Sequence, residues 1–199
     1  MKTTKIIDER IELTQHIPEF EYLLDRYINL KAKNVVEIGS YFGSSLHHWL
    51  YYSEENARVI AIDLPISSFC GPNDPRVPVQ EFAIQNEWKL WTKRNNNKLH
   101  LIQSHSQSVS TKLQVEKLLE GEPLDFLFID GDHRYDAVKR DFEMYSPLVR
   151  KGGIVALHDI GYAEEGGVHK LWDEIKGYHI HHELRLHPNR EKGIGIITI

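Results

Sequence analysis

Cysteine is almost absent from this chain, since Cys70 is the only one among 199 residues. An internal disulfide therefore cannot form, and a zinc site built from cysteines is excluded. The sequence also lacks an apolar stretch close to the roughly 20 residues that a membrane span requires. Its first residues contain no apolar run of signal-peptide length. We therefore expect a cytoplasmic protein with no membrane partner.

An excess of positive charge is missing as well: 24 lysines and arginines face 29 aspartates and glutamates. A protein that coats nucleic acid needs a basic surface to neutralise phosphates. We therefore expect no nucleic-acid partner and a small-molecule substrate instead, and we leave a homo-oligomer open. The length suits a single domain of the α/β class that buries a substantial core.

Strands and helices alternate along the chain, which predicts a doubly wound α/β fold with a mostly parallel sheet. Apolar runs predict five successive strands, at 34–40, 58–64, 99–103, 124–130 and 154–158. The segments 181–186 and 193–199 are too close in sequence for a helical crossover. They predict a C-terminal antiparallel hairpin.

Apolar residues at helical spacing predict helices between these strands. The first covers 10–31, and Pro18 is expected to divide it. The others are predicted at 43–52, 79–93, 109–119, 135–149 and 168–176. The segment 70–79 contains glycine and three prolines and is predicted to be a loop.

A glycine turn follows the first strand, in the order Glu37-Ile38-Gly39-Ser40-Tyr41-Phe42-Gly43. Ligands of open parallel sheets bind at the carboxyl ends of the strands. Glycines there let backbone N–H groups approach a ligand closely. A plain strand-to-helix turn is the alternative. Tyr41 stands where a dinucleotide fingerprint needs glycine for the pyrophosphate, so we expect a cofactor without pyrophosphate.

Polar side chains also end the second and third strands. Asp63 follows an apolar run, and a carboxylate at that place can accept both hydroxyls of a ribose. An exposed loop aspartate is the alternative. Ser104-His105-Ser106 ends the third strand, where small polar groups would meet an adenine edge. Ser106 serves almost equally well as the N-cap of the next helix.

Taken together, Glu37-x-Gly39-x-x-x-Gly43, Asp63 and the strand 126–130 resemble the class I S-adenosylmethionine-dependent methyltransferases. The blocks 128–142 and 145–160 are similar to the subgroup that contains macrocin O-methyltransferase and the cephalosporin-hydroxylase-like proteins. The resemblance implies a seven-stranded Rossmann-like methyltransferase fold. It also implies an N-terminal helical segment, 1–33, before an S-adenosylmethionine-binding methyltransferase domain, 34–199.

The same resemblance implies which residues contact the methionine part of S-adenosylmethionine. Gly39, Ser40 and Gly43 would line it, together with Ser45 at the start of the helix. Glu37 would act near the ammonium group of the cofactor, directly or through water.

The nucleoside part is implied in the same way. Asp63 would hold the ribose beside Leu64, and 104–106 would lie next to the adenine. Many relatives carry an acidic residue near position 105, where this chain has His105, so the adenine contact departs from the usual pattern. Asp130, at the end of the fourth strand, would also contact the cofactor.

The reacting end is expected where two adjacent strands end, at Asp130, His133, His158 and Asp159. By resemblance to metal-dependent O-methyltransferases, Asp130 and Asp159 are the predicted ligands of Mg²⁺ or another divalent cation. Such relatives place a second carboxylate or an amide beside the equivalent of Asp159, where this chain has His158 and Ile160. Mg²⁺ affinity would then be weaker, or His158 would donate nitrogen to a transition metal.

General-base catalysis by His133 or His158 is the alternative to metal assistance, because a neutral imidazole takes up a proton near working pH. The predicted activity is O-methylation of a small molecule, such as a sugar or a glycosylated metabolite. A hydroxylase-like tailoring enzyme and a non-catalytic cofactor-binding protein are the competing hypotheses. The loop 164–167 is expected to lie over the site.

Overall fold

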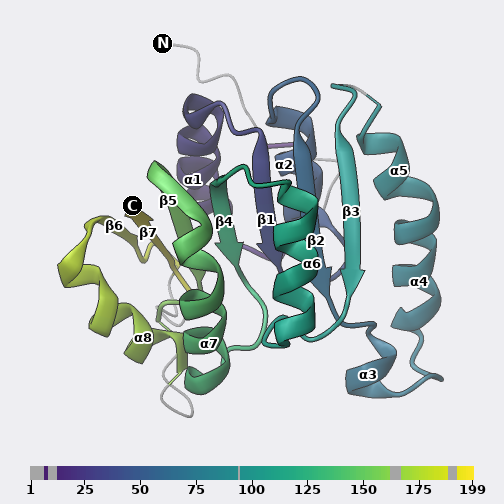
Figure 1. Ribbon diagram of the computed structural model, residues 1–199. Helices are drawn as coiled ribbons and strands as arrows, with labels where there is room; N and C mark the ends of the chain where they lie inside the picture. The colour runs from purple at the N-terminus through teal and green to yellow at the C-terminus, as the bar shows by residue number, and fades with distance from the viewer. Residues whose placement is uncertain (1–6, 9–12, 94, 162–166, 188–191) are drawn as a thin grey trace.

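A seven-stranded sheet forms the centre of the protein in the computed structural model, with helices on both faces (Figure 1). The structure describes residues 7–8, 13–93, 95–161, 167–187 and 192–199. The strands are β1 (Asn34–Ile38), β2 (Arg58–Asp63), β3 (Lys98–Gln103), β4 (Leu124–Ile129), β5 (Val149–His158), β6 (Ile180–Leu184) and β7 (Ile194–Thr198). Their order in the sheet is β3-β2-β1-β4-β5-β7-β6.

The strand pairings confirm the predicted fold class. Strands β1 to β5 pair in parallel, whereas β7 lies antiparallel to both β5 and β6. The strand order reverses between β1 and β4, because the chain first builds the sheet outward to β3 and then returns. This switch point is where open α/β sheets bind ligands, beyond the carboxyl ends of the strands.

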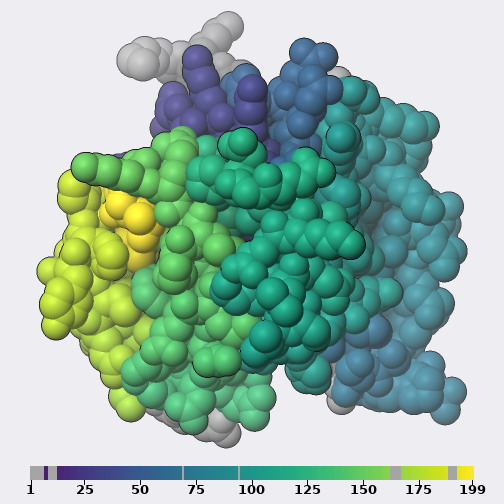
Figure 2. Space-filling model, viewed as in Figure 1, coloured from purple at the N-terminus to yellow at the C-terminus, as the bar shows by residue number. Residues whose placement is uncertain are grey.

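Two groups of helices cover the sheet. Helices α6 (Val109–Leu119), α7 (Tyr135–Tyr145) and α8 (Gly167–Ile175) pack on one face, as the surface in Figure 2 shows. The opposite face carries α1 (Ile17–Leu30), α2 (Ser44–Tyr52) and the succession α4 (Arg76–Phe82), η1 (Ala83–Glu87) and α5 (Trp88–Trp91). The remaining short helices are α3 (Ser67–Cys70), η2 (Ser146–Leu148) and η4 (Lys176–Tyr178). Within the described residues, no helix has the length and apolar character needed to cross a bilayer.

The N-terminal helix differs from its prediction. It begins at Ile17, and Pro18 lies in its first turn instead of dividing a longer helix. Proline is tolerated there because the first N–H groups of a helix have no intrahelical acceptor. Residues 13–16 are not helical, and 9–12 lie outside the described residues. The apolar side chains of α1 pack in the same core as those of β1 and β4.

The predicted loop 70–79 is wrong in its second half. Helix α4 begins at Arg76, with Pro75 as its N-cap and Pro78 within its first turn. Prolines at these positions are compatible with a helix start, so their number misled the prediction. The predicted helix 135–149 is also too long, because α7 ends at Tyr145 and Pro147 lies in the short turn η2. Strand β5 begins at Val149, earlier than the predicted 154.

Candidate functional site

The turn after β1 contains three residues with left-handed backbone: Gly39 (φ 87°), Tyr41 (φ 50°) and Gly43 (φ 87°). A Cβ on Gly39 would lie 2.1 Å from the carbonyl oxygen of Asp130, so glycine lets the ends of β1 and β4 approach each other. A Cβ on Gly43 would lie 2.3 Å from Nε1 of Trp88. Glycine is therefore required at position 43 for two reasons: its left-handed backbone and its close packing against α5.

Replacing Gly43 by alanine is expected to lower the free energy of unfolding by roughly 2–4 kcal/mol, combining a left-handed alanine with overpacking against Trp88. Gly121→Ala is the matched control, because Gly121 has a φ of 86° and a Cβ added there would meet nothing within 4 Å. It should lose only about 1 kcal/mol. Urea denaturation measures both, and equal losses would show that Trp88 does not constrain this turn.

Asp63 lies at the end of β2 and binds the glycine turn. Its Oδ2 accepts hydrogen bonds from the backbone N–H groups of Ser40 (3.1 Å) and Tyr41 (2.6 Å), and its Oδ1 accepts from Leu64 (2.7 Å). Burial raises the pKa of Asp63, although these three N–H groups stabilise its charged form. The carboxylate thus connects β2 to the turn and lines a cavity.

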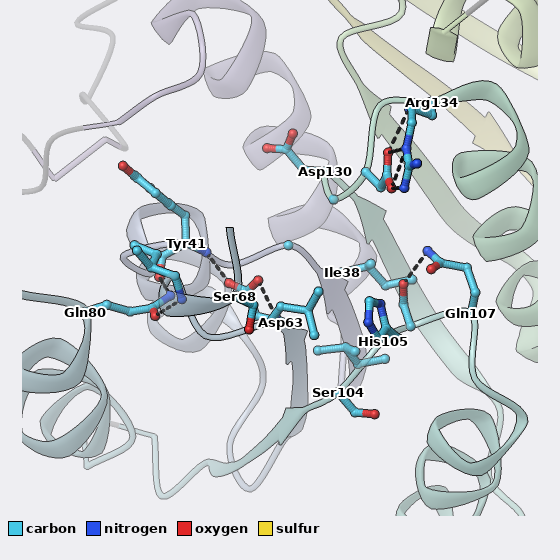
Figure 3. A pocket seen from close by; sticks show the side chains of 17 residues that line it. Ile38, Tyr41, Asp63, Ser68, Gln80, Ser104, His105, Gln107, Asp130 and Arg134 are labelled. Atoms are coloured by element: carbon cyan, nitrogen blue, oxygen red, sulfur yellow. Dashed lines mark hydrogen bonds and ion pairs between the residues drawn. The ribbon is translucent and has the colours of Figure 1, made fainter. Parts of the chain in front are cut away.

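This cavity has a volume of about 590 Å³ and opens at the switch point between β1 and β4. Figure 3 shows Asp63 in the middle, with Asp130 and Ser104 toward opposite ends. Its lining is Ile38, Gly39, Tyr41, Ile62, Asp63, Leu64, Ile66, Ser68, Gln80, Ser104, His105, Ser106, Gln107, Asp130, Gly131, Asp132 and Arg134. We name it the nucleoside cavity after the ribose and adenine contacts that the sequence predicts for Asp63 and residues 104–106.

A buried network holds one end of the nucleoside cavity. Gln107 donates from Nε2 to both carboxylate oxygens of Asp141, at 3.1 and 3.0 Å, and to the hydroxyl of Ser106. Tyr145 donates its hydroxyl to the carbonyl of Ser106 at 2.7 Å. Burial raises the pKa of Asp141 to about 6. Ser106 is not the helix cap considered from sequence, since Ser108 occupies the N-cap position of α6.

Glu37 lies beneath the turn and lines neither the nucleoside cavity nor the second cavity described below. It is fully buried, and its carboxylate accepts hydrogen bonds from the Ser40 hydroxyl (2.7 Å) and the Trp49 indole (2.8 Å). Burial raises the pKa of Glu37 to about 7, against the stabilising effect of these donors. Any effect of Glu37 on a ligand therefore passes through the turn.

A second cavity, of about 280 Å³, shares the wall formed by Gly39, Tyr41, Asp130 and Gly131. We name it the acidic cavity because two aspartates lie in it. The rest of its lining is Thr14, Gln15, Ser40, Ser44, Ser45, His133, His158, Asp159 and Lys192. The shared wall means that a ligand in one cavity can contact a ligand in the other.

Two aspartates and two histidines face one another in the acidic cavity. Nδ1 of His158 lies 3.1 Å from Oδ1 of Asp130 and 3.2 Å from Oδ2 of Asp159. Nε2 of His133 lies 3.3 Å from Oδ2 of Asp159 and 3.7 Å from Oδ1 of Asp130. Asp159 has a φ of 56°, a strained conformation that is frequent at functional sites.

The charges in this cluster stabilise one another. Burial disfavours the charged form of His158, but Asp130 and Asp159 outweigh it and raise its pKa to about 10. Burial likewise disfavours the Asp130 carboxylate, yet the two histidines hold its pKa well below the usual range. The nearby Asp130 carboxylate, together with Asp159, also raises the pKa of His133.

The donor atoms of Asp130, His133 and Asp159 lie within 4.8 Å of one another, so these residues can hold a divalent cation. Two carboxylates and one imidazole suit Mg²⁺ or Mn²⁺. His158 is absent from this set, so His133 is the nitrogen donor that the geometry favours. Among the described residues, the histidines at 179–187 form no such group.

The structure brings most of the predicted site residues to the two cavities. The nucleoside cavity takes Gly39, Asp63, Leu64, Ser104, His105, Ser106 and Asp130. The acidic cavity takes Gly39, Ser40, Ser45, Asp130, His133, His158 and Asp159. Glu37 and Gly43 line neither. The predicted loop 164–167 lies outside the described residues, except for Gly167 at the start of α8.

Several lining residues were not predicted. Gln107 follows the motif 104–106 directly, so extending that motif by one residue would have found it. Gln80, which lies in α4 and within the predicted helix 79–93, donates to the carbonyl of Tyr41 at 3.0 Å. Gln15 falls in the part of the predicted helix 10–31 that is not helical in the structure, and Lys192 precedes β7; neither position carries a local signal for the site. Only the tertiary fold places them there.

Together, the fold and the paired cavities define an α/β protein with a ligand site at the switch point of its sheet. Residues 36–160 match a family model described as "Methyltransferase domain". The chain therefore belongs to this methyltransferase family, which confirms the class of protein that its motifs resemble.

Individual relatives agree with this assignment. "Probable caffeoyl-CoA O-methyltransferase 1" of Dictyostelium discoideum is 33% identical over 163 residues, which are 79% of this chain and 60% of that protein. An uncharacterised protein of Acanthamoeba polyphaga mimivirus is 36% identical over 141 residues, 69% of this chain and 58% of that protein. The chain thus spans about 60% of the length of these curated relatives.

Solved structures share the fold at low sequence identity. The O-methyltransferase from Bacillus cereus in complex with SAH is 16% identical, has a TM-score of 0.65, and is matched over 96% of this chain and 85% of its own. A TDP-rhamnose 3′-O-methyltransferase of calicheamicin biosynthesis is 15% identical, with a TM-score of 0.60 over 89% of this chain and 76% of its own. These matches confirm the methyltransferase-type arrangement of the sheet.

Proposed function

We propose that this protein transfers a methyl group from S-adenosylmethionine to a hydroxyl of a small molecule, with help from a divalent cation. The observation that carries the proposal is the wall shared by the two cavities. The nucleoside cavity offers Asp63 to a ribose and the Ser104–Gln107 segment to an adenine. The acidic cavity begins at the same Asp130, where the methyl end of such a cofactor would lie.

Bound S-adenosylmethionine would supply an already activated methyl group, and a cation on Asp130, His133 and Asp159 would lower the pKa of the acceptor hydroxyl. The protein's own contribution is mainly alignment of the acceptor oxygen with the methyl carbon. The carbon–sulfur bond breaks as the carbon–oxygen bond forms, and the hydroxyl proton must leave. That proton would leave to solvent, because His133 would use its free nitrogen lone pair on the cation and the side chain of His158 is only 5% exposed.

The lining of the acidic cavity also favours a polar molecule as the methyl acceptor. Its lining combines the hydroxyls of Thr14, Ser44 and Ser45 with the ammonium group of Lys192. Such groups can form hydrogen bonds with a molecule that carries several hydroxyls. We therefore propose a sugar or a glycosylated metabolite as the acceptor. The test measures formation of S-adenosylhomocysteine (SAH), the demethylated cofactor, with nucleotide sugars, glycosides and catechols as acceptors. Turnover of catechols alone would contradict this substrate class.

Calorimetric titration with SAH tests the cofactor part of the proposal, and no binding at millimolar SAH would overturn it. Asp63→Asn is expected to weaken SAH binding by about 10- to 100-fold, because hydrogen bonds to a charged acceptor are lost. Asp25→Asn is the matched control, since Asp25 is exposed on α1 and lines neither of these cavities. Equal affinity in the two variants would remove Asp63 from the cofactor site.

A further inference from the structure

Gln15 is the buried amide of the acidic cavity. It lies in the segment before α1, far in sequence from Asp130, and is only 6% exposed. Its Nε2 donates a hydrogen bond to Oδ2 of Asp130 at 2.7 Å. Its Oε1 is buried and has no hydrogen-bond partner among the described residues. The site thus contains a strong acceptor that nothing in the described chain uses.

An unpaired buried amide oxygen is unfavourable, and native proteins rarely keep one without a partner outside the chain. The missing partner must be electron-poor, because an amide oxygen only accepts. The surroundings point to a cation, since the Gln15 amide is hydrogen-bonded to the Asp130 carboxylate and lies in a cavity that also contains Asp159. Asp130 already belongs to the group with His133 and Asp159 whose donor atoms lie within 4.8 Å of one another.

The orientation of the Gln15 amide is set by the Asp130 carboxylate. A carboxylate oxygen needs a donor, so the NH₂ group of Gln15 faces it. In this orientation the oxygen of the same amide has no hydrogen-bond partner and is the atom that a cation would contact.

We propose that Oε1 of Gln15 is a fourth protein ligand of the divalent cation, beside Asp130, His133 and Asp159. The inference rests on the metal assistance in the proposed function and extends it to the N-terminal segment. Three oxygens and one imidazole nitrogen favour Mg²⁺ or Mn²⁺ over softer metals. Cation binding would then fix the chain just before α1, the helix that packs against β1 and β4.

The experiment is titration of the full chain with Mn²⁺, followed by the electron paramagnetic resonance signal of the free ion. Gln15→Met removes both polar atoms at nearly constant volume and is expected to raise the Mn²⁺ dissociation constant by about tenfold or more. Gln15→Glu keeps an oxygen ligand and adds charge. It should bind Mn²⁺ at least as tightly as the wild type, and Mn²⁺ should raise its melting temperature by more.

The two variants distinguish two roles of Gln15: a ligand of the cation, and a residue that only donates a hydrogen bond to Asp130. If Gln15 merely donates, Gln15→Glu should weaken Mn²⁺ binding as much as Gln15→Met, which would overturn the inference. Unchanged Mn²⁺ affinity in Gln15→Met would overturn it too. Gln114→Met, on the exposed face of α6, is the matched control and should match the wild type. A wild type that binds SAH but no Mn²⁺ would refute this inference and leave the cofactor assignment standing.

Discussion

Asp130→Asn is expected to lower the turnover number by about 10²- to 10³-fold while the protein stays folded, the range found when a preorganised charged or polar group is removed from an active site. Asp130 is the one predicted residue besides Gly39 that lines both cavities. Its carboxylate faces His133 and His158 and accepts the hydrogen bond from Gln15. Asparagine keeps the volume and one oxygen but removes the charge that a cation requires.

Turnover is measured as SAH formation with the acceptor that the substrate panel identifies, and Mn²⁺ binding is measured on the same sample. Both should fall in Asp130→Asn. Asp136→Asn is the control, because Asp136 is exposed in the first turn of α7 and changes the net charge equally. SAH formation at the wild-type rate by Asp130→Asn would show that the acidic cavity is not where the reaction takes place.

The sequence predicts the centre of this site well because the relevant residues all follow strands. A buried parallel strand is a continuous apolar run, and its end is marked by the first polar residue. Asp63, Asp130 and His158 are read directly from that rule, and Asp159 is the next residue. Parallel strands end at the same edge of the sheet, so residues distant in sequence are predicted to meet there.

Glu37 belongs to the predicted motif, but its side chain lies on the far side of the turn from both cavities. Successive side chains of a strand point to opposite faces of the sheet. Glu37 therefore shares its face with Val35, on the side covered by α1 and α2, and it is buried against Trp49. The alternation of side chains along the strand therefore indicates the face on which Glu37 lies, and of the two predicted modes, direct contact or action at a distance, this position favours the second.

Other parts of the site have no local signal. Gln15 precedes α1 and Lys192 precedes β7, and each reaches the acidic cavity only because the fold brings its segment there. Lys192 donates to the carbonyl of Thr14 at 3.0 Å, so these two segments also bind each other. Contacts of this kind depend on the packed chain and not on periodicity, which is why residue patterns alone did not reveal them.

Glu37→Gln is expected to stabilise the protein above neutral pH by up to roughly 3 kcal/mol, the free energy linked to the difference between a folded pKa of about 7 and the ordinary value of 4.5. Because the pKa is raised in the folded state, the folded protein keeps a proton that the unfolded chain releases. Wild-type stability therefore falls as pH rises from about 4.5 to about 7 and stays low above that. Glutamine does not ionise, so the variant does not lose stability in this way as the pH rises.

Urea denaturation between pH 4.5 and pH 8 measures the difference. Glutamine can still accept from Trp49 and donate to Ser40, so the local hydrogen bonds survive. Glu143→Gln is the control, since Glu143 is exposed on α7, and its pH dependence should match the wild type. Parallel stability curves for wild type and Glu37→Gln would mean that the carboxylate is not kept protonated by burial.

A destabilising buried carboxylate is retained in a protein when function requires its charge. If Glu37 attracts the ammonium group of the cofactor through the Ser40 turn, Glu37→Gln should weaken SAH binding even as it stabilises the fold. The ammonium group of bound SAH would in turn favour the ionised Glu37 carboxylate. SAH should therefore bind more tightly above pH 7 in the wild type than in the variant. A stabilised variant that binds SAH with unchanged affinity at every pH would assign Glu37 to the structure of the turn alone.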